Sequence, residues 1–302
     1  MPDVIKVTNL TKTFNDFTAV ANLSFTVSEG AVYGFLGQNG AGKSTTIRML
    51  TTLIQPTGGL IQIFGLNLAQ HSTEILRNIG AVIERPDLYK YLTAYENVQL
   101  FGKLSRVHPT RKQIMELLHK VGLADRAHSK MKTYSQGMKQ RLGIATALIH
   151  EPQLIILDEP VNGLDPQGIA DIRHLILHLQ QDMGKTILVS SHLLTEMEMI
   201  ATDLLIISKG AKVVEGKLAA LLNPNSIQVA LTVQDVQRTQ AALQATSWGA
   251  HCVGVVDDAL VYTMHTNDIP QFNNQLVALG IPVQGLRAKH SLEDYFLQLT
   301  GS

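Results

Sequence analysis

The sequence predicts an α/β core with a mixed sheet and a helical insertion, followed by a small C-terminal α+β domain. Three observations lead to this fold class: the chain length, the alternation of short apolar runs with helical periods, and a turn-rich segment late in the chain. With 302 residues, 45% of them hydrophobic and 17% charged, the chain has the size and composition for about two globular domains.

The first strands are expected early in the chain. Val4–Thr8 and Ser24–Val27 alternate in character, whereas Ala31–Gly37 is more continuously apolar and indicates a buried strand. Helical periods and buried strands then alternate. This alternation is typical of an α/β domain with a largely parallel sheet.

A helical subdomain is expected at about residues 86–150. The pattern is mostly helical from about Thr93 to His150, and a helix that begins at Ser135 continues until Pro152 stops it. Buried strands are expected to resume at Leu154–Leu157, Thr186–Ser191 and Leu204–Ser208.

The turn-rich segment Leu221–Ser226 divides the chain into expected domains 1–222 and 223–302. Beyond it the predicted order is strand, helix, strand, strand, helix, strand, which matches the split βαβ arrangement of ferredoxin-like domains. These strands are expected at Ile227–Val233, Cys252–Val256, Leu260–Met264 and near Val283. A last helix is expected from Ser291, because Asp294 completes a capping-box pattern.

Composition disfavours several classes of protein. Lysine plus arginine and aspartate plus glutamate are balanced at 25 each, so no nucleic-acid partner is expected from bulk charge. The single cysteine, Cys252, cannot form an intramolecular disulfide. The N-terminus lacks signal-peptide character, and no run approaches about eighteen apolar residues, so a cytoplasmic location is expected.

The segment GQNGAGKST follows a buried strand and opens a helix. Its glycines free backbone amides to surround phosphate oxygens, Lys43 can reach the outer phosphates, and the Ser44 hydroxyl can ligate magnesium. A nucleoside triphosphate and Mg²⁺ are therefore the expected ligands. The expected binding residues are Gly37, Asn39, Gly40, Ala41, Gly42, Lys43, Ser44 and Thr45.

The segment LIILDEP places Asp158 and Glu159 at the carboxyl end of a buried strand, where ligands bind in open α/β sheets. Asp158 suits magnesium, held directly or through water, and Glu159 suits the orientation and deprotonation of an attacking water. The alternative is that both are surface charges. The segment GQNGAGKST, Gly37–Thr45, is called the phosphate loop below. Together with this loop, the Asp158–Glu159 pair fits kinases, GTPases and many ATPases alike.

The segment TYSQGMKQRLGIATALIHEP narrows the choice. Ser135 is a good helix N-cap, and Gly137 leaves the amides at that helix terminus open to an anion. An ordinary capped helix is the alternative.

In this order the motifs resemble those of the ATP-binding cassette (ABC) family, over about residues 4–216. The family's further motifs fall on Glu84 at the glutamine-loop position, on Tyr134–Met138 as the signature, on Gly163–Asp165 as the GLD loop and on His192 as the switch histidine. The resemblance implies a P-loop ABC ATPase core that binds ATP.

The resemblance also implies how these residues work together. Two cassettes close head to tail over two ATP molecules, with Ser135 and Gly137 of one copy facing the phosphate loop of the other. His192 is expected to contact the γ-phosphate, and Asp165 to carry signals across the dimer. Phe14 occupies the place where the family usually stacks a tyrosine on adenine, and a plain core residue is the alternative.

Two departures from the family pattern stand out. In the signature, Gln136 replaces a usual glycine and Met138 a usual glutamine, which leaves Ser135 and Gly137 in place. Glu84 stands where glutamine is the rule, and this variant resembles the ATPase subunits of bacitracin-resistance and lantibiotic-immunity exporters.

Glu84 has two interpretations. It is either a solvated charge where a strand meets a loop, or a residue near both magnesium and the permease. A carboxylate there would attract the metal and repel the γ-phosphate, which makes Glu84 a candidate sensor and, with Ser44 and Asp158, a candidate metal-binding residue. Leu88, Tyr89 and Tyr91 are expected to offer apolar contact to the permease.

The expected function is ATP hydrolysis that powers export of a peptide antibiotic or another amphipathic compound through a separate permease. Lys43, Glu159 and His192 are the expected catalytic residues. The expected partners are a second ATP-binding subunit, as a homodimer, and a multi-span permease of the ABC-2 type that holds the chain at the inner face of the cell membrane.

The alternative function is that of a soluble ABC ATPase of DNA repair, translation or cofactor assembly. A DNA-repair protein would need a long coiled coil, and a translation factor would need a second cassette. A module that holds ATP without turnover is disfavoured, since all three catalytic residues are present.

Overall fold

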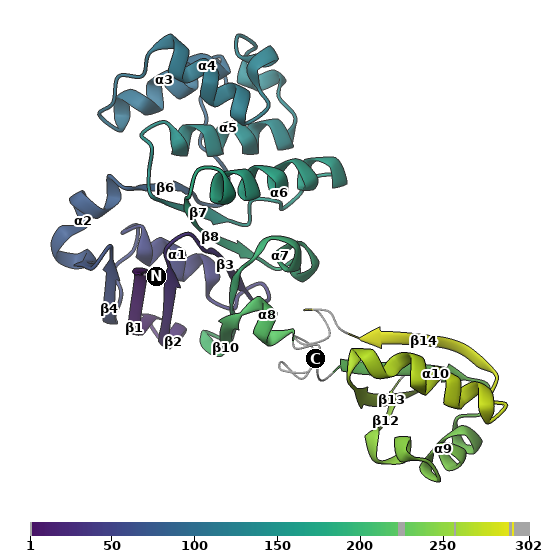
Figure 1. The fold of residues 1–302 in the computed structure, drawn as a ribbon. Coiled ribbons are helices and arrows are strands. Elements are labelled where there is room, and N and C mark those ends of the chain that lie inside the picture. The colour runs from purple at the N-terminus through teal and green to yellow at the C-terminus, as the bar shows by residue number, and fades with distance from the viewer. Residues whose placement is uncertain (1, 223–226, 257, 290–291, 293–302) are drawn as a thin grey trace. The chain divides into compact units, whose positions relative to one another are not determined.

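The computed structural model describes residues 2–222, 227–256, 258–289 and 292. The chain forms two compact units, Met1–Leu218 and Ala219–Ser302, and each is described by itself (Figure 1).

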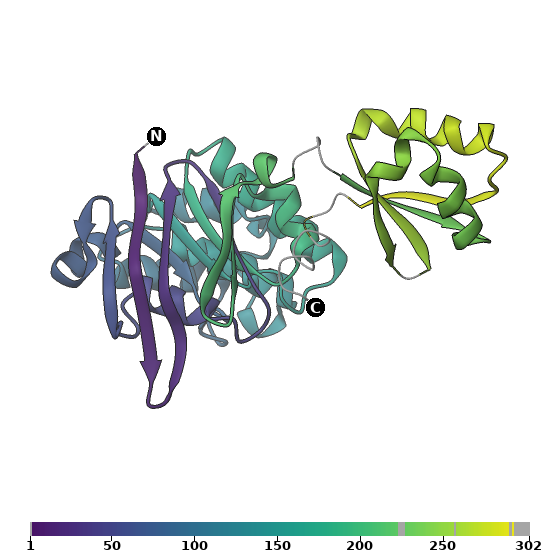
Figure 2. The same ribbon diagram turned by 90° about the horizontal axis from the view of Figure 1, so that it is seen from below.

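The first unit contains an antiparallel sheet with the strand order β2-β1-β4-β5. Its strands are β1 (Asp3–Phe14), β2 (Phe17–Ser28), β4 (Gly58–Ile63) and β5 (Leu66–Asn67). β1 and β2 are longer than the predicted Val4–Thr8 and Ser24–Val27, and Figure 2 shows them side by side as a long hairpin. Register shifts between Val7 and Leu10 and between Leu10 and Lys12 interrupt the alternation of side chains, so the sequence pattern underestimates the strand.

A second sheet of the first unit has six strands in the order β10-β9-β3-β8-β7-β6. Its strands are β3 (Val32–Leu36), β6 (Ile79–Val82), β7 (Leu154–Asp158), β8 (Thr186–Ser191), β9 (Asp203–Ser208) and β10 (Ala211–Lys217). Only the β9–β10 pair in this sheet is antiparallel, so the predicted mixed and largely parallel sheet is confirmed. Every residue of β3, β7 and β8 is buried, as in strands covered on both faces.

A shared hydrophobic core joins the two sheets through helix α1 (Lys43–Leu50). Val7 and Phe25 of the antiparallel sheet, Phe35 and Ile156 of the parallel sheet, and Ile47 of α1 belong to one buried cluster. Helix α1 begins directly after the phosphate loop, so this packing fixes the position of the loop.

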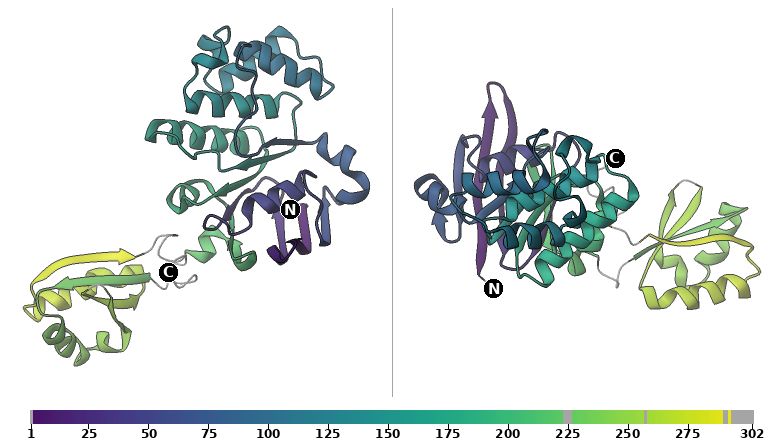
Figure 3. Two further views of the ribbon diagram at one scale, coloured as in Figure 1. Left: turned by 180° about the vertical axis from the view of Figure 1, so that it is seen from behind. Right: turned by 90° about the horizontal axis from the view of Figure 1, so that it is seen from above.

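Three helices, α3 (Ala94–Leu104), α4 (Arg111–Lys120) and α5 (Gln136–Leu148), are grouped on one side of the first unit (Figures 1 and 3). Their N-caps are Thr93, Thr110 and Ser135, and each side chain accepts a hydrogen bond from the backbone amide three residues further on. Short 3₁₀ helices at Ala124–Arg126 and Met131–Thr133 lie between α4 and α5. The remaining helices within residues 2–222 are α2 (Leu68–Leu76), α6 (Pro166–Gln181), α7 (Leu194–Ile200) and α8 (Leu218–Leu221), of which α8 spans the division between the two units.

The second unit has the order of elements that the sequence predicts. These elements are β11 (Ile227–Val233), α9 (Val236–Gln244), β12 (Cys252–Val256), β13 (Ala259–Met264), α10 (Ile269–Ala278) and β14 (Val283–Lys289), with 3₁₀ helices at Ser247–His251 and Thr266–Asp268. The strand order β12-β13-β11-β14, antiparallel throughout, interleaves two split βαβ units as in ferredoxin-like domains. Leu231, Tyr262 and Phe272 lie in its own hydrophobic cluster. The last helix predicted from Ser291 lies outside the described residues, of which only Leu292 belongs to that segment.

Candidate active site

The phosphate loop runs from the end of β3 to the start of α1, and its shape depends on glycine. Gly42 has φ of +105°, and a Cβ there would lie 2.7 Å from the carbonyl oxygen of Ala19. A Cβ at Gly37 would lie 2.5 Å from the carbonyl oxygen of Ile207. The loop therefore lies directly against backbone on both sides. Among the predicted binding residues Asn39 and Gly40 are exposed, Ala41 is buried, and Ser44 and Thr45 are half-buried.

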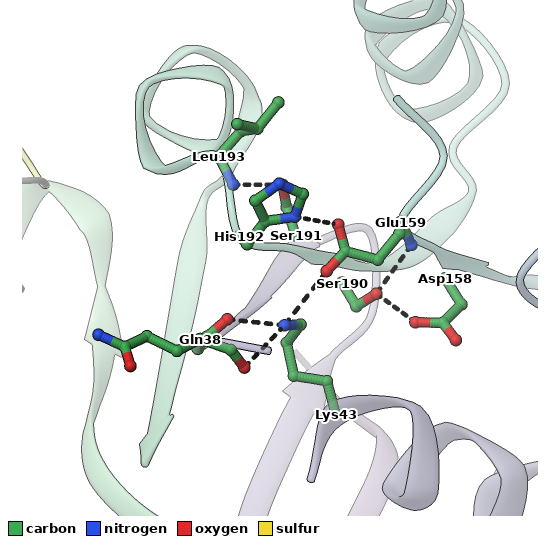
Figure 4. Close-up of polar contacts among 9 residues, drawn as sticks. Gln38, Lys43, Asp158, Glu159, Ser190, Ser191, His192 and Leu193 are labelled. Atoms are coloured by element: carbon green, nitrogen blue, oxygen red, sulfur yellow. Dashed lines mark hydrogen bonds and ion pairs between the residues drawn. The ribbon is translucent and has the colours of Figure 1, made fainter. Parts of the chain in front are cut away.

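Lys43 is buried and points back under the loop (Figure 4). Its Nζ donates to the carbonyl oxygens of Gly37 at 2.6 Å and Gln38 at 3.3 Å. It also forms an ion pair with Oε1 of Glu159 at 3.1 Å. The phosphate loop and the end of β7 are thus joined by one ammonium group.

Glu159 joins Lys43 to His192. Its second carboxylate oxygen, Oε2, lies 2.7 Å from Nδ1 of His192 (Figure 4). The backbone of Glu159 is in the left-handed region, with φ of +49°, an uncommon conformation for a residue with a side chain. Its amide donates to Oγ of Ser190 at 2.9 Å, which holds this conformation in place. Three predicted catalytic residues therefore lie in one network.

Asp158 is 1% exposed and accepts a hydrogen bond from Oγ of Ser190 at 2.5 Å. Its other oxygen, Oδ2, is buried and has no hydrogen-bond partner in the described part of the chain. A buried carboxylate oxygen without a donor is costly, unless a cation binds there. Asp158 and Ser44 line the same cavity of about 500 Å³, together with Glu84 and Glu159. Hydroxyl and carboxylate oxygens suit magnesium, so these residues fit that metal.

Glu84 lies in this cavity, but its charge already has a partner. Its carboxylate forms an ion pair with the guanidinium of Arg48 in the last turn of α1. Glu84 also has φ of +60°, two residues after the end of β6. Arg48 is a site residue that the sequence alone does not indicate, because 36 residues separate it from Glu84 and no short-range pattern joins them.

The loop after Glu84 packs against α5. A Cβ at Gly143 of α5 would lie only 2.5 Å from Cβ of Pro86, so the two backbones approach closely there. Gln140, one turn earlier, lines the same cavity as Glu84, and its buried Nε2 has no partner within the described residues. Gln140 is a further site residue that the sequence alone does not indicate.

The expected permease contacts divide into two groups. Tyr89 and Tyr91 are 55% and 81% exposed, whereas Leu88 is 8% exposed. The expectation for Leu88 is therefore wrong: the side chain packs inside the unit and cannot offer an apolar surface to a partner.

The remaining predicted residues lie outside the network of Lys43, Glu159 and His192. Ser135 is exposed, and its Oγ accepts from the amide of Met138 at 3.3 Å. Asp165 caps α6 by accepting from the amide of Gly168 at 3.1 Å. A Cβ on Gly137 would lie 3.7 Å from Cα of Gly168, so the start of α5 lies against the start of α6.

Phe14 lies at the end of β1 and is 45% exposed, with Nζ of Lys12 at 4.8 Å from the ring centroid. The alternative that Phe14 is a core residue is therefore wrong. An exposed ring at this edge remains available to stack against a flat ligand.

The chain is similar to proteins of known family. It matches the family model described as ABC transporter over residues 20–162. It is 41% identical over 303 residues to the bacitracin transport ATP-binding protein BcrA of Bacillus licheniformis, and the alignment covers 100% of this chain and 98% of the relative. It is 42% identical over 212 residues to the lantibiotic transport ATP-binding protein SrtF of Streptococcus pyogenes, which covers 70% of this chain and 90% of the relative.

Solved structures give the same result. The dimeric post-hydrolysis state of the ATP-binding cassette MJ0796 bound to ADP and Pi matches with a TM-score of 0.64 and 30% identity, over 71% of this chain and 98% of that chain. A structure of the ATP binding subunit of an ABC transporter matches with a TM-score of 0.63 and 31% identity, over 72% of this chain and 91% of that chain. The family predicted from the motifs is confirmed, and this chain belongs to the ATP-binding proteins of ABC transporters, as one of their ATPases.

Proposed function

We propose that this chain is the ATP-hydrolysing subunit of an ABC exporter and powers the export of a peptide antibiotic or another amphipathic compound through a separate membrane permease. The observation that carries the ATPase part is the joint contact of Glu159 with Lys43 and His192 beside the phosphate loop. Similarity along the whole chain to a bacitracin transport protein favours a peptide antibiotic as the cargo.

Gly37–Thr45 and the N-terminus of α1 are proposed to hold the ATP phosphates, with Phe14 against the adenine. Ser44 and Asp158 are the proposed magnesium ligands, supported by the unpartnered Oδ2 of Asp158. Glu84 is a further oxygen donor in the same cavity. When bound, magnesium neutralises charge on the phosphates.

Glu159 is the proposed general base. Both of its carboxylate oxygens are engaged, one with Lys43 and the other with His192. A phosphate oxygen that takes Lys43 as its donor would release Oε1 of Glu159, which can then accept a proton from water. His192 donates through Nδ1 to Glu159. Only an imidazolium has a second N–H, at Nε2, which it can donate to an oxygen of the γ-phosphate. The contact between Glu159 and His192 thus positions both the general base and the residue that is proposed to contact the γ-phosphate.

A second copy of the chain is the proposed partner in hydrolysis. Ser135 is exposed at the start of α5, and Asp165 is exposed at the start of α6, so both are accessible to another subunit. A matching cassette of 30% identity is described as dimeric. In this arrangement Ser135 and Gly137 contact the nucleotide held by the other copy.

Transport is favoured over soluble roles in DNA repair, translation or cofactor assembly. Residues 37–159 are all described, and the longest helix among them is α5 with 13 residues, so the long coiled coil of repair proteins is not part of this segment.

A multi-span permease of the ABC-2 type is the proposed membrane partner, and the chain would lie at the inner face of the cell membrane through it. None of the helices in the described residues has the length and apolar character to cross a bilayer. Tyr89 and Tyr91, exposed beside the loop that carries Glu84, are the proposed contacts.

Affinity purification from detergent-solubilised membranes tests this function. We expect the tagged chain to recover a multi-span membrane protein, and Tyr89→Ala/Tyr91→Ala to recover less of it at equal expression. In the native host, loss of ATPase activity through Glu159→Gln should lower resistance to the exported peptide. Recovery of soluble partners alone, with unchanged resistance, would refute an export function.

A further inference from the structure

The ion pair between Arg48 and Glu84 joins the phosphate-binding helix to the loop that follows β6. Arg48 lies in the last turn of α1, and the two side chains are 41% and 59% exposed. Exposed ion pairs are individually weak, so this contact can be exchanged for another one without a large rearrangement. The backbone around it is less free, because Pro86 is packed against Gly143 of α5.

Helical spacing places the alternative partner of Glu84 nearby. Ser44 and Arg48 are four residues apart on α1, so they lie on the same face of the helix, about 6 Å apart along its axis. Ser44 lines the cavity together with Glu84 and Asp158. Arg48 and the metal position at Ser44 therefore offer the Glu84 carboxylate two neighbouring partners on one face of α1.

Electrostatic interactions determine whether the Glu84 carboxylate lies at Arg48 or near Ser44. Asp158, Glu159 and Glu84 all line one cavity, and only Glu159 in this set has Lys43 as its ion-pair partner. A free Glu84 carboxylate would add negative charge where polyanionic phosphates must bind, and would also attract a divalent cation. Arg48 neutralises that charge.

We propose that Arg48 is a positioning residue of the ATPase site, which holds the Glu84 carboxylate at the last turn of α1 and releases it to the metal held at Ser44 and Asp158. This role rests on the proposed function. Arg48 thereby limits how strongly Glu84 attracts magnesium and how strongly it repels the phosphates. Because the same loop packs against α5, a movement of α5 changes the distance over which Arg48 can hold Glu84.

The experiment measures binding of a non-hydrolysable fluorescent ATP analogue to the full-length chain as a function of free Mg²⁺. For Arg48→Gln we expect the half-saturating Mg²⁺ concentration to fall about threefold to fivefold, the scale of an exposed charge pair, and metal-free binding to weaken by a similar factor. Arg48→Lys keeps the charge and should restore most of both values. Arg77→Gln, an exposed arginine at the end of α2, is the matched control and should change neither value.

The double variant Arg48→Gln/Glu84→Gln separates this role from general damage. In the Glu84→Gln background the Arg48 substitution should have less than about a twofold effect, because its partner is already neutral. An undiminished effect in that background would overturn the proposal, and so would unchanged Mg²⁺ dependence in Arg48→Gln itself.

The variant Lys43→Ala separates a failure of the proposed ATPase site from a failure of the proposed role of Arg48. If the chain fails to bind the analogue, or if Lys43→Ala binds it as tightly as the unaltered chain, the proposed ATPase site fails and the role of Arg48 fails with it. If Lys43→Ala weakens binding while the Arg48 variants give an overturning result, only the role of Arg48 is lost.

Discussion

Single residues in the network around Glu159 have separable tasks. Ser190 accepts from the Glu159 amide and donates to Asp158, so one hydroxyl holds the backbone of Glu159 and orients the carboxylate of Asp158. Lys43 and His192 then occupy the two oxygens of Glu159. A substitution that keeps the shape of Glu159 but removes its basicity therefore tests the chemical step with little structural change.

Glu159→Gln should leave ATP binding intact and slow turnover by roughly two to four orders of magnitude, the scale of a lost general base. The amide retains one oxygen to accept from a neighbour but cannot take a proton from water. Single-turnover hydrolysis and nucleotide binding measured on the same preparation check this, and size-exclusion chromatography with Mg²⁺ and ATP should show a dimer accumulating. Near-normal turnover would remove Glu159 from the role of base.

At the scale of elements, the contact between β6 and α5 connects the parallel sheet to the group of helices α3, α4 and α5. A Cβ at Gly80 of β6 would lie 2.2 Å from the carbonyl oxygen of Ala147 in α5 and 2.9 Å from Cγ of Pro152. Just beyond α5, Nε2 of His150 lies 3.0 Å from the carbonyl oxygen of Ile79, and burial lowers the pKa of this histidine. β6 and α5 therefore approach as closely as their backbones allow.

Gly80→Ala should destabilise the first unit by about 1–3 kcal/mol or more, because the new methyl group meets a backbone carbonyl that cannot rotate away. Gly58→Ala in β4 is the matched control: a Cβ there meets nothing within 4 Å, so the change should stay within about 0.5 kcal/mol. Urea unfolding of both variants measures the difference. Equal urea midpoints for the two variants would contradict this prediction, because the β6–α5 contact would then accommodate the methyl group without loss of stability.

The elements that the sequence predicted well are those with an unbroken period. β7 and β8 each contain a run of consecutive apolar residues, Leu154–Leu157 and Ile187–Val189, and are buried throughout, and the helix from Ser135 has a clear cap. β4 and β10 were missed, since β4 begins with two glycines and no residue of β10 is fully buried, which leaves little pattern to read.

The candidate site was predictable to the extent that its residues fall in contiguous motifs. Lys43 was found in this way within GQNGAGKST, and Asp158 and Glu159 within LIILDEP, where a buried strand ends. The Arg48–Glu84 pair and the contact of Pro86 with Gly143 arise from packing between segments far apart in the chain, which no local pattern encodes. The same reason explains why Leu88 was misjudged as an exposed apolar residue.

At the scale of the whole molecule, the chain combines two units that each have a hydrophobic cluster of their own. Lys43, Glu159 and His192 form the ion-pair and hydrogen-bond network, and all three lie in the first unit. In the second unit, Leu231, Tyr262 and Phe272 form a core with contributions from both sheet and helix. This separation of cores favours independent folding.

A chain truncated after residue 222 should therefore fold and bind ATP with an affinity within about twofold of the full chain, because sites without shared partners couple by less than about 0.5 kcal/mol. Fluorescence titration with an ATP analogue measures this affinity, and Lys43→Ala within the truncated chain should abolish the signal if binding occurs at the phosphate loop. We expect the truncation to weaken dimer stability or regulation instead. Sedimentation of the Glu159→Gln variant with and without residues 223–302 measures the change in dimer stability. A truncated chain that is folded by circular dichroism but no longer binds the analogue would contradict the boundary, because the nucleotide site would then depend on the second unit.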